Sequence, residues 1–176
     1  MCEEKHSSHE VREAALTDLR AIQNLHNALC HFEYESGFDP DIDLERSYST
    51  QFTEYLGSRI SEPTGVALVA TSQGVVVGYL LGSVNDGPKG KRAKLESMFV
   101  LPEYRRRGVG RGLVSAFLHW MQGVEALAAT VAVAPRNHSA VTLYRKLGFL
   151  DHTLVLEARP DSTVASKGNT PTIASS

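Results

Sequence analysis

The sequence has few cysteines, and its histidines are not grouped as metal ligands. Its 176 residues include two cysteines, Cys2 and Cys30, and seven histidines scattered along the chain. Two cysteines cannot form a disulfide framework, and no Cys/His cluster has the spacing of a zinc site. We therefore expect free thiols and no bound metal.

Long hydrophobic runs and a strong charge imbalance are also missing. The longest nearly unbroken apolar run, residues 75–84, contains two glycines and is far shorter than the roughly 20 residues of a bilayer span. The first ten residues are polar and acidic, unlike a secretory signal. Eighteen Lys and Arg against 20 Asp and Glu give a net charge of −2, which predicts no nucleic-acid or membrane-surface partner. We expect a cytoplasmic protein.

The distribution of apolar residues predicts one folded domain with polar ends. Apolar residues make up 42% of the chain, which is enough for one sizeable core at this length. No internal repeat or long linker divides the sequence. We expect a flexible leader at residues 1–9, a single domain at 10–158 and a flexible tail at 159–176, where few apolar residues occur.

Strand and helix patterns alternate between these ends. Thr17 is expected to cap the first helix, Gly57 to end the second, and residues 71–74 to join a β-hairpin. The expected strands are residues 10–14, 66–70, 75–81, 95–101, 126–134 and 149–157. The expected helices begin at Thr17 and near Leu44, cover residues 108–122, and run from Asn137 to Gly148. Strands alternating with helices beside one hairpin predict a mixed-sheet α/β or α+β domain.

The segment from Leu101 to Gly112, LPEYRRRGVGRG, joins an expected strand to an amphipathic helix. Its glycines let the backbone approach a ligand, and amides at a helix start bind anions, phosphate above all. Its arginines add charge and match the geometry of phosphate. The turn therefore predicts binding of a phosphorylated cofactor.

Other glycine-rich motifs and a plain basic helix start are the alternatives for this turn. A dinucleotide-binding G-x-G-x-x-G would need its third glycine where Leu113 stands, and a Walker A loop would need G-K-[ST], which the turn lacks. Solvated arginines on a tight turn stay open as a purely structural explanation.

Two motifs resemble the GNAT superfamily of acyl-CoA N-acyltransferases. Residues 95–110, LESMFVLPEYRRRGVG, fit a strand ending in V-x-P-E-[Y/A] followed by [R/Q]-x-x-G-x-[G/A]. Residues 137–149, NHSAVTLYRKLGF, fit the family helix N-x-x-A-x-x-[L/F]-Y-x-K-x-G-F. The resemblance implies a central mixed, mostly antiparallel β-sheet, splayed between its fourth and fifth strands and flanked by about four α-helices.

The resemblance also implies that acetyl-CoA is the cosubstrate, bound between the strands near residues 98–100 and 131–133. Backbone groups of the first strand would pair with pantetheine, the amides of the arginine turn would hold the pyrophosphate, and Asn137 would contact the cofactor. Family members often have glycine where this chain has Arg106. The cofactor-binding residues implied in this way are Met98, Phe99, Val100, Arg105, Arg106, Arg107, Gly108, Val109, Gly110, Asn137 and Tyr144.

Tyr144 and Glu96 are the candidate catalytic residues. Acyl transfer to an amine needs a base, because a lysine-like amine is neutral in only about one of 2,500 molecules at pH 7. Glu96 stands where many family members have an acidic residue that works through water. Tyr144 would protonate the leaving CoA thiolate, to which a phenol is matched. A core-packed tyrosine and a salt-bridged strand carboxylate are the structural alternatives.

The acceptor is expected to bind near an acidic stretch. Residues 33–45 contain six Asp and Glu and no Lys or Arg, so they would attract a cationic amine, unless they are only a solvated face. Aromatic side chains there would supply apolar or cation–π walls. The candidate acceptor-binding residues are Glu33, Glu35 and Phe38.

Acetyl transfer from acetyl-CoA to a primary amine, of a small molecule or a peptide, is the function that these features predict. A non-catalytic CoA-binding sensor or interaction module is the alternative, and a nucleotide-binding protein that uses the arginine turn is a further one. The resemblance also implies a possible homodimer.

Overall fold

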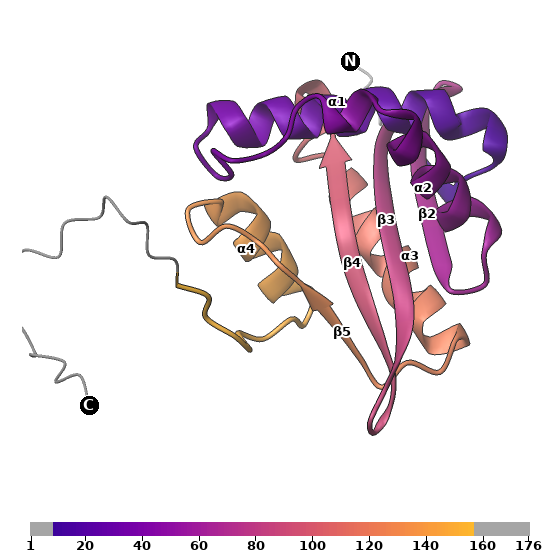
Figure 1. Cartoon of the computed structure of the whole chain (residues 1–176), viewed down its shortest axis with the longest axis vertical. Helices are drawn as coiled ribbons and strands as arrows, with labels where there is room; N and C mark the ends of the chain where they lie inside the picture. Colours follow the sequence, from indigo (N-terminus) through magenta and orange to yellow (C-terminus); the bar gives the residue numbers. More distant parts are fainter. Residues whose placement is uncertain (1–8, 157–176) are drawn as a thin grey trace, which may run out of the picture.

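The computed structural model describes residues 9–156, which form a five-stranded β-sheet with helices on both faces (Figure 1). The strand order is β1-β2-β3-β4-β5; β1 to β4 are antiparallel, and β5 pairs with β4 in parallel. The strands are β1 (His9–Glu13), β2 (Gly65–Ser72), β3 (Val75–Gly87), β4 (Gly90–Val100) and β5 (Ala128–Val131). The helices are α1 (Leu19–Glu35), α2 (Thr50–Ser61), α3 (Val109–Gly123) and α4 (His138–Lys146), with short 3₁₀ turns η1 (Leu16–Asp18), η2 (Arg46–Tyr48) and η3 (Pro102–Tyr104). This mixed, mostly antiparallel sheet confirms the predicted fold class.

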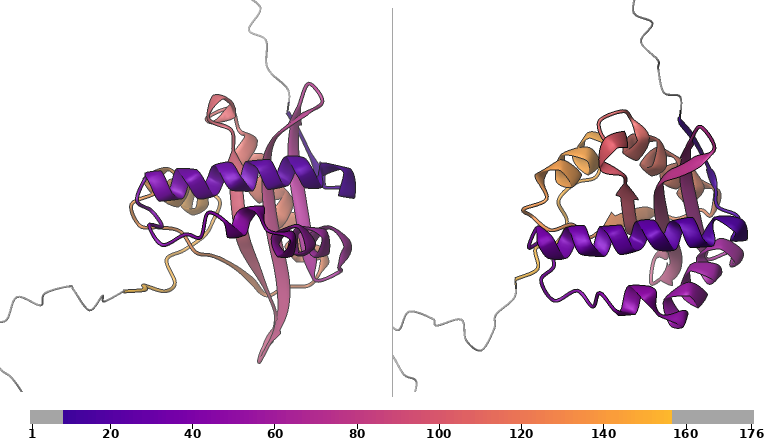
Figure 2. Two further views of the ribbon diagram at one scale, coloured as in Figure 1. Left: turned by 45° about the horizontal axis from the view of Figure 1, so that its top comes forward. Right: turned by 90° about the horizontal axis from the view of Figure 1, so that it is seen from above.

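The sheet is buried on both faces, with α1 and α2 on one side and α3 on the other (Figure 2). Successive residues of a strand point to opposite faces, so Leu68 of β2 packs with Leu113 of α3, whereas Val69 packs with Ile22 of α1. Burial on both faces explains why β2 and β3 have nearly continuous apolar sequences.

The fourth and fifth strands pair over only part of their length. Residues 92–95 of β4 pair with 128–131 of β5, and β4 then continues to Val100. No strand within residues 9–156 pairs with this far end of β4 on the β5 side. Figure 1 shows β5 turning away from β4, as predicted for a splayed sheet.

The structure corrects several local predictions. The N-cap of α1 is Asp18 rather than Thr17, and β1 already begins at His9. Helix α2 continues through Gly57 to Ser61, because Leu56 and Ile60 pack against the core and outweigh the low helix propensity of one glycine. Residues 149–156 contain no strand, so the strand predicted at 149–157 is wrong over this range. The rest of the predicted leader and all of the tail lie outside the described residues.

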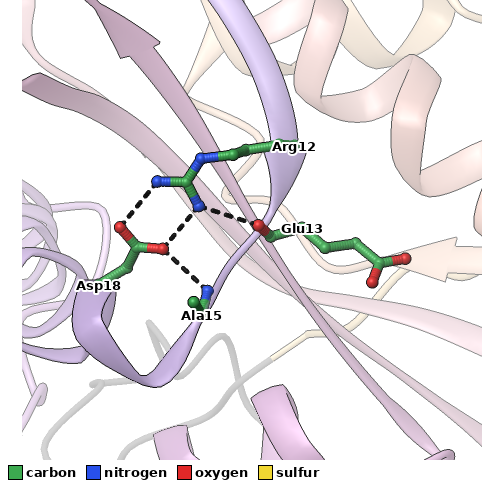
Figure 3. Close-up of polar contacts among 4 residues, drawn as sticks. All are labelled: Arg12, Glu13, Ala15 and Asp18. Carbon is green, nitrogen blue, oxygen red and sulfur yellow. Dashed lines mark hydrogen bonds and ion pairs between the residues drawn. The ribbon is translucent and has the colours of Figure 1, made fainter. Parts of the chain in front are cut away.

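An ion pair fixes the start of α1 to β1 (Figure 3). Arg12 donates to both carboxylate oxygens of Asp18, at 2.7 and 2.9 Å, and the backbone amide of Ala15 donates to the same carboxylate at 2.8 Å. The side chain of Asp18 is 9% exposed and that of Arg12 is 42% exposed. The hydrogen bonds from Arg12 and Ala15 hold the pKa of Asp18 below its ordinary value.

Asp18→Ala should lower the free energy of unfolding by about 1–3 kcal/mol, because it removes a charged hydrogen-bond acceptor whose partner is partly screened by water. The folded-state pKa is lowered, so the stabilisation is complete above the ordinary aspartate pKa of about 3.9 and is lost as pH falls through the folded value. Urea denaturation at pH 7 and at pH 3 measures both effects. Asp151→Ala is the control, since its pair with Arg145 is exposed; an equal loss there would contradict the prediction.

Within residues 9–156, no helix is both long enough and apolar enough to cross a lipid bilayer.

Candidate active site

The turn between β4 and α3 has the backbone geometry of an anion site. Gly108 is the N-cap of α3 and has a left-handed conformation, φ 86°, and Arg106 is also left-handed, φ 63°. The first amides of a helix have no partner within the helix, and the helix dipole favours negative charge at this end. The start of α3 is therefore suited to a phosphate group. The amide of Arg105 differs, because it donates to the carbonyl of Pro102 at 3.2 Å.

The side chain of Arg105 does not extend toward this turn. Its Nε donates to the carbonyl oxygen of Val100 at 2.9 Å. The guanidinium carbon lies 4.8 Å from the ring centroid of Phe32 and 5.1 Å from that of Phe99. Burial lowers the pKa of Arg105 from its ordinary value. Arg105 thus fastens α1 to the end of β4, and the exposed arginines of the segment from Leu101 to Gly112 are Arg106, Arg107 and Arg111.

One long groove brings most of the predicted site residues together. It runs from the acidic end of α1, past the end of β4 and the start of α3, to α4. Of the predicted residues, those that line it are Glu33, Phe38, Glu96, Met98, Phe99, Val100, Arg105, Arg106, Gly108, Gly110, Asn137 and Tyr144. Glu35, Arg107 and Val109 do not line it, and the side chain of Val109 is buried in the core.

Tyr144 lies on the groove wall formed by α4. Its side chain is 93% buried by packing that includes an edge contact with the ring of Phe149 at 5.6 Å. Its hydroxyl forms no hydrogen bond with any residue in the described part of the chain. Burial, with a smaller effect from the charge of Glu33, raises the pKa of Tyr144 to about 12. The phenol is therefore a proton donor at neutral pH.

Asn137 caps α4, as its position in the sequence predicts. Its side-chain oxygen accepts hydrogen bonds from the amide of Ala140 at 3.2 Å and from the hydroxyl of Ser139 at 3.1 Å. Contact of Asn137 with a cofactor stays a prediction.

Glu96 points away from solvent into a set of three hydrogen-bond donors. The hydroxyl of Tyr55 and Nε of Arg59, at 3.0 Å, both donate to Oε2, and the hydroxyl of Ser83 donates to Oε1 at 2.8 Å. Burial and the bond to Glu96 raise the pKa of Tyr55 to about 12. Glu96 therefore holds α2 against β3 and β4, and a proton acceptor role for it stays a prediction.

The acidic end of α1 forms the opposite wall. Glu33 is half-buried, and burial together with the charge of Asp39 raises its pKa. Phe38 packs edge-on against Phe32 at 5.7 Å. Glu35 is exposed and lies outside the groove. Of the acidic stretch that is predicted to bind the acceptor, the carboxylate residues that line the groove are therefore Glu33, Asp39, Asp41 and Asp43.

No group of three His, Cys, Asp or Glu side chains among residues 9–156 has an arrangement that could hold a metal ion.

Residues 22–149 match the sequence profile described as the Acetyltransferase (GNAT) family. The chain belongs to this family. The matched range contains both motifs and the groove lining from α1 to Phe149, and residues 150–155 of the lining lie beyond it.

This GNAT chain is similar to curated acetyltransferases at low identity. It is 29% identical over 154 residues to an N-alpha-acetyltransferase of Sulfurisphaera tokodaii, covering 82% of each chain. It is 29% identical over 82 residues to the aminoglycoside N(6′)-acetyltransferase type 1 of Klebsiella aerogenes, covering 44% of this chain and 54% of the relative. The match thus spans about half the length of the aminoglycoside enzyme.

Solved structures share the fold. The aminoglycoside N-acetyltransferase AAC(6′)-Iy in complex with CoA superposes with a TM-score of 0.68 at 19% identity, covering 91% of this chain and 99% of that one. A predicted acetyltransferase from Clostridium acetobutylicum with acetyl-CoA gives a TM-score of 0.69 at 17% identity, covering 86% and 96%.

The GNAT motifs do not reveal the partners of Glu96. Tyr55 and Arg59 are four residues apart on α2, so they lie on one helix face, and the guanidinium of Arg59 lies 4.8 Å from the ring centroid of Tyr55. This spacing in the sequence could have indicated that Tyr55 and Arg59 act together. No such sequence pattern indicates Ser83, because it occurs within an apolar strand and only the β3–β4 register brings it near Glu96.

Proposed function

We propose that this chain is an N-acetyltransferase that moves the acetyl group of acetyl-CoA to a primary amine. The observation that carries the proposal is a single groove in which the open helix start at Gly108, the far end of β4 and the hydroxyl of Tyr144 meet. The family and the CoA complexes of structural neighbours support this assignment.

The chain's own residues fit coenzyme A. Amides from Arg106 to Gly110 would bind the pyrophosphate. Gly108 has no side chain that would keep the phosphate away from these amides, and the space where a Cβ would lie is open apart from His9, at 3.5 Å. The main chain of Met98 to Val100 would pair with pantetheine along the edge that β5 leaves open. When bound, acetyl-CoA supplies the activated acyl group.

The residues around the acetyl group would then transfer protons and stabilise the charge that develops during the reaction. Backbone amides near Val100 would stabilise the oxyanion that develops on the carbonyl. Tyr144, neutral and buried, would donate its proton to the sulfur as the C–S bond breaks. Attack by the amine needs a base. The sequence predicts Glu96 for this role, although three hydrogen-bond donors already hold its carboxylate.

The acceptor is proposed to be cationic. Carboxylates from the α1 end line one wall of the groove, and such groups attract and orient ammonium ions. Both a small polyamine or aminoglycoside and a protein or peptide amine fit this description. Relatives named for aminoglycosides and for N-alpha-acetylation are consistent with either. A homodimer is proposed from the family resemblance, and sedimentation velocity tests it.

An acetylation screen tests the proposal. Purified protein is given acetyl-CoA and a panel of polyamines, aminoglycosides, amino acids and basic peptides, and thiol release is followed. We expect turnover with at least one cationic amine. Tight CoA binding without turnover on any amine would favour a non-catalytic CoA-binding module, and equal or tighter binding of ATP or NAD would favour a nucleotide-binding protein.

Gly108→Val should weaken CoA binding by about tenfold to 100-fold. A β-branched residue is strained by about 1–3 kcal/mol in the left-handed conformation and would shift the amides of the turn. Isothermal titration calorimetry with CoA measures the loss.

Gly74→Val is the matched control. Gly74 is also left-handed, φ 78°, but lies in the β2–β3 turn outside the groove. Its replacement should cost stability without changing CoA affinity. Full affinity in Gly108→Val would show that the turn is an ordinary helix start.

A further inference from the structure

Two of the carboxylates that line the groove, those of Glu96 and Glu33, have opposite chemical surroundings. Both oxygens of Glu96 already accept hydrogen bonds, from Tyr55, Arg59 and Ser83. The guanidinium of Arg59 also forms an ion pair with this carboxylate, with Nε 3.0 Å from Oε2. The carboxylate of Glu96 is thus already engaged in joining α2 to β3 and β4.

Glu33 has the opposite surroundings. It lies in the last turns of α1, half-buried on the groove wall. Its carboxylate accepts no hydrogen bond from the residues the structure describes. Its backbone carbonyl accepts the amides of Phe38 and Asp39, at 2.9 and 3.3 Å, which fixes the chain around it. The lone pairs of Glu33 are therefore free within a site of fixed geometry.

The turn of α1 that carries Glu33 lies over the end of β4. The ring of its neighbour Phe32 is 6.3 Å from that of Phe99, and Arg105 packs against both rings. Figure 1 shows this end of α1 above α4, and the view from above in Figure 2 shows α4 beside this end of the helix and not directly beneath it. The charge of Glu33 also acts on the hydroxyl of Tyr144. Glu33 and Tyr144 thus line the same groove, one from α1 and the other from α4.

We infer that Glu33 is the general base of the acetyl transfer, taking a proton from the acceptor ammonium either directly or through one water. This inference rests on the proposed function. The ammonium gives one proton to the Glu33 carboxylate, and the nitrogen lone pair forms the C–N bond as the C–S bond breaks. Tyr144 passes its proton to the thiolate, and the second nitrogen proton, released as the amide forms, restores the Tyr144 phenol. The products are the acetamide, CoA thiol and one proton, which leaves Glu33 for water.

The electrostatic surroundings support the assignment. Burial and Asp39 raise the pKa of Glu33, and a base whose pKa is nearer to neutrality accepts a proton more readily. Five other titratable or charged groups lie around Glu33. They are Cys30 of α1, Asp39 of the loop after α1, Tyr79 of β3, Arg105 of the segment after β4, and Tyr144 of α4.

Glu33→Gln tests the inference with the amine that the wild-type protein acetylates fastest. We expect kcat/KM at pH 7 to fall about 100-fold or more. The variant should depend on amine that is already neutral, so its kcat/KM should rise about tenfold per pH unit below the pKa of the amine. Calorimetric affinity for CoA should be unchanged. Glu33→Asp, which keeps a shorter carboxylate, should restore part of the rate.

Two comparison variants distinguish the loss of a general base from the loss of a negative charge elsewhere in the protein. Glu54→Gln removes an exposed carboxylate of α2 that lies outside the groove, and it should retain full activity. Glu96→Gln should lower stability in urea because it leaves Arg59 without its carboxylate partner, yet its pH profile should keep the wild-type shape.

The outcomes are distinct. Wild-type rate and pH profile in Glu33→Gln overturn the inference and leave the proposed function intact. A lowered rate with an unchanged profile in Glu33→Gln also overturns it, because binding of the acceptor alone would then explain the loss. Absence of thiol release by the wild-type protein with every amine overturns the proposed function and this inference together.

Discussion

Replacing Tyr144 with phenylalanine should lower turnover at neutral pH by about 100-fold or more and leave CoA affinity nearly unchanged. The ring is 93% buried and packs against Phe149, so the variant keeps this packing. The hydroxyl has no hydrogen-bond partner in the described structure, so its loss leaves no orphaned group in the protein. What disappears is the proton donor that faces the groove.

Thiol release and calorimetry with CoA separate the two effects of Tyr144→Phe. Because burial raises the pKa of Tyr144 to about 12, the wild-type protein should keep this proton donor as pH rises past the ordinary tyrosine pKa of about 10. Tyr48→Phe is the control, since Tyr48 is exposed and outside the groove. Unchanged turnover in Tyr144→Phe would remove this residue from the mechanism.

Phe117→Ala should lower the free energy of unfolding by about 3–5 kcal/mol. Phe117 has no exposed surface and stacks with Trp120, with ring centroids 5.8 Å apart. It also fills the space that a side chain at Gly82 would need, since a Cβ there would lie 2.5 Å from Cε2 of Phe117. The substitution therefore opens a cavity between α3 and β3.

A double-mutant cycle with Gly82→Ala checks this packing. Gly82→Ala alone should destabilise the protein by about 1–3 kcal/mol through the clash with Phe117. In the Phe117→Ala background the added methyl group enters the cavity, so the two losses should not add. Additive losses in urea denaturation would show that the two positions do not compete for one space.

The site motifs were predictable because their chemistry is local. Gly108 is left-handed where the sequence requires glycine, and Asn137 caps α4. The alternation of strands and helices likewise follows from short-range patterns, and β2 and β3 form the predicted hairpin.

The remaining features depend on contacts between distant segments. The side chain of Arg105 bonds to Val100 and packs on Phe32, which no local pattern indicates because Phe32 comes from α1. The sequence predicts Glu96 as a base, but the groups that donate hydrogen bonds to its carboxylate come from α2 and β3, which the sequence around Glu96 does not reveal. The strand predicted after Gly148 fails for a related reason. Leu150 and Leu154 are 88% and 75% exposed, so an apolar sequence there is not matched by a strand partner among residues 9–156.

The early separation of β5 from β4 has a consequence for the protein before it meets its cosubstrate. Residues 96–100 have no neighbouring strand on this side in the described structure, and the carbonyl of Val100 there is covered by Arg105. Such an open strand edge is a template for extended polypeptide, and it is a common origin of aggregation. A ligand that covers it stabilises the native state by mass action. Saturating CoA should therefore keep the purified protein monodisperse at temperatures where the same protein without CoA precipitates.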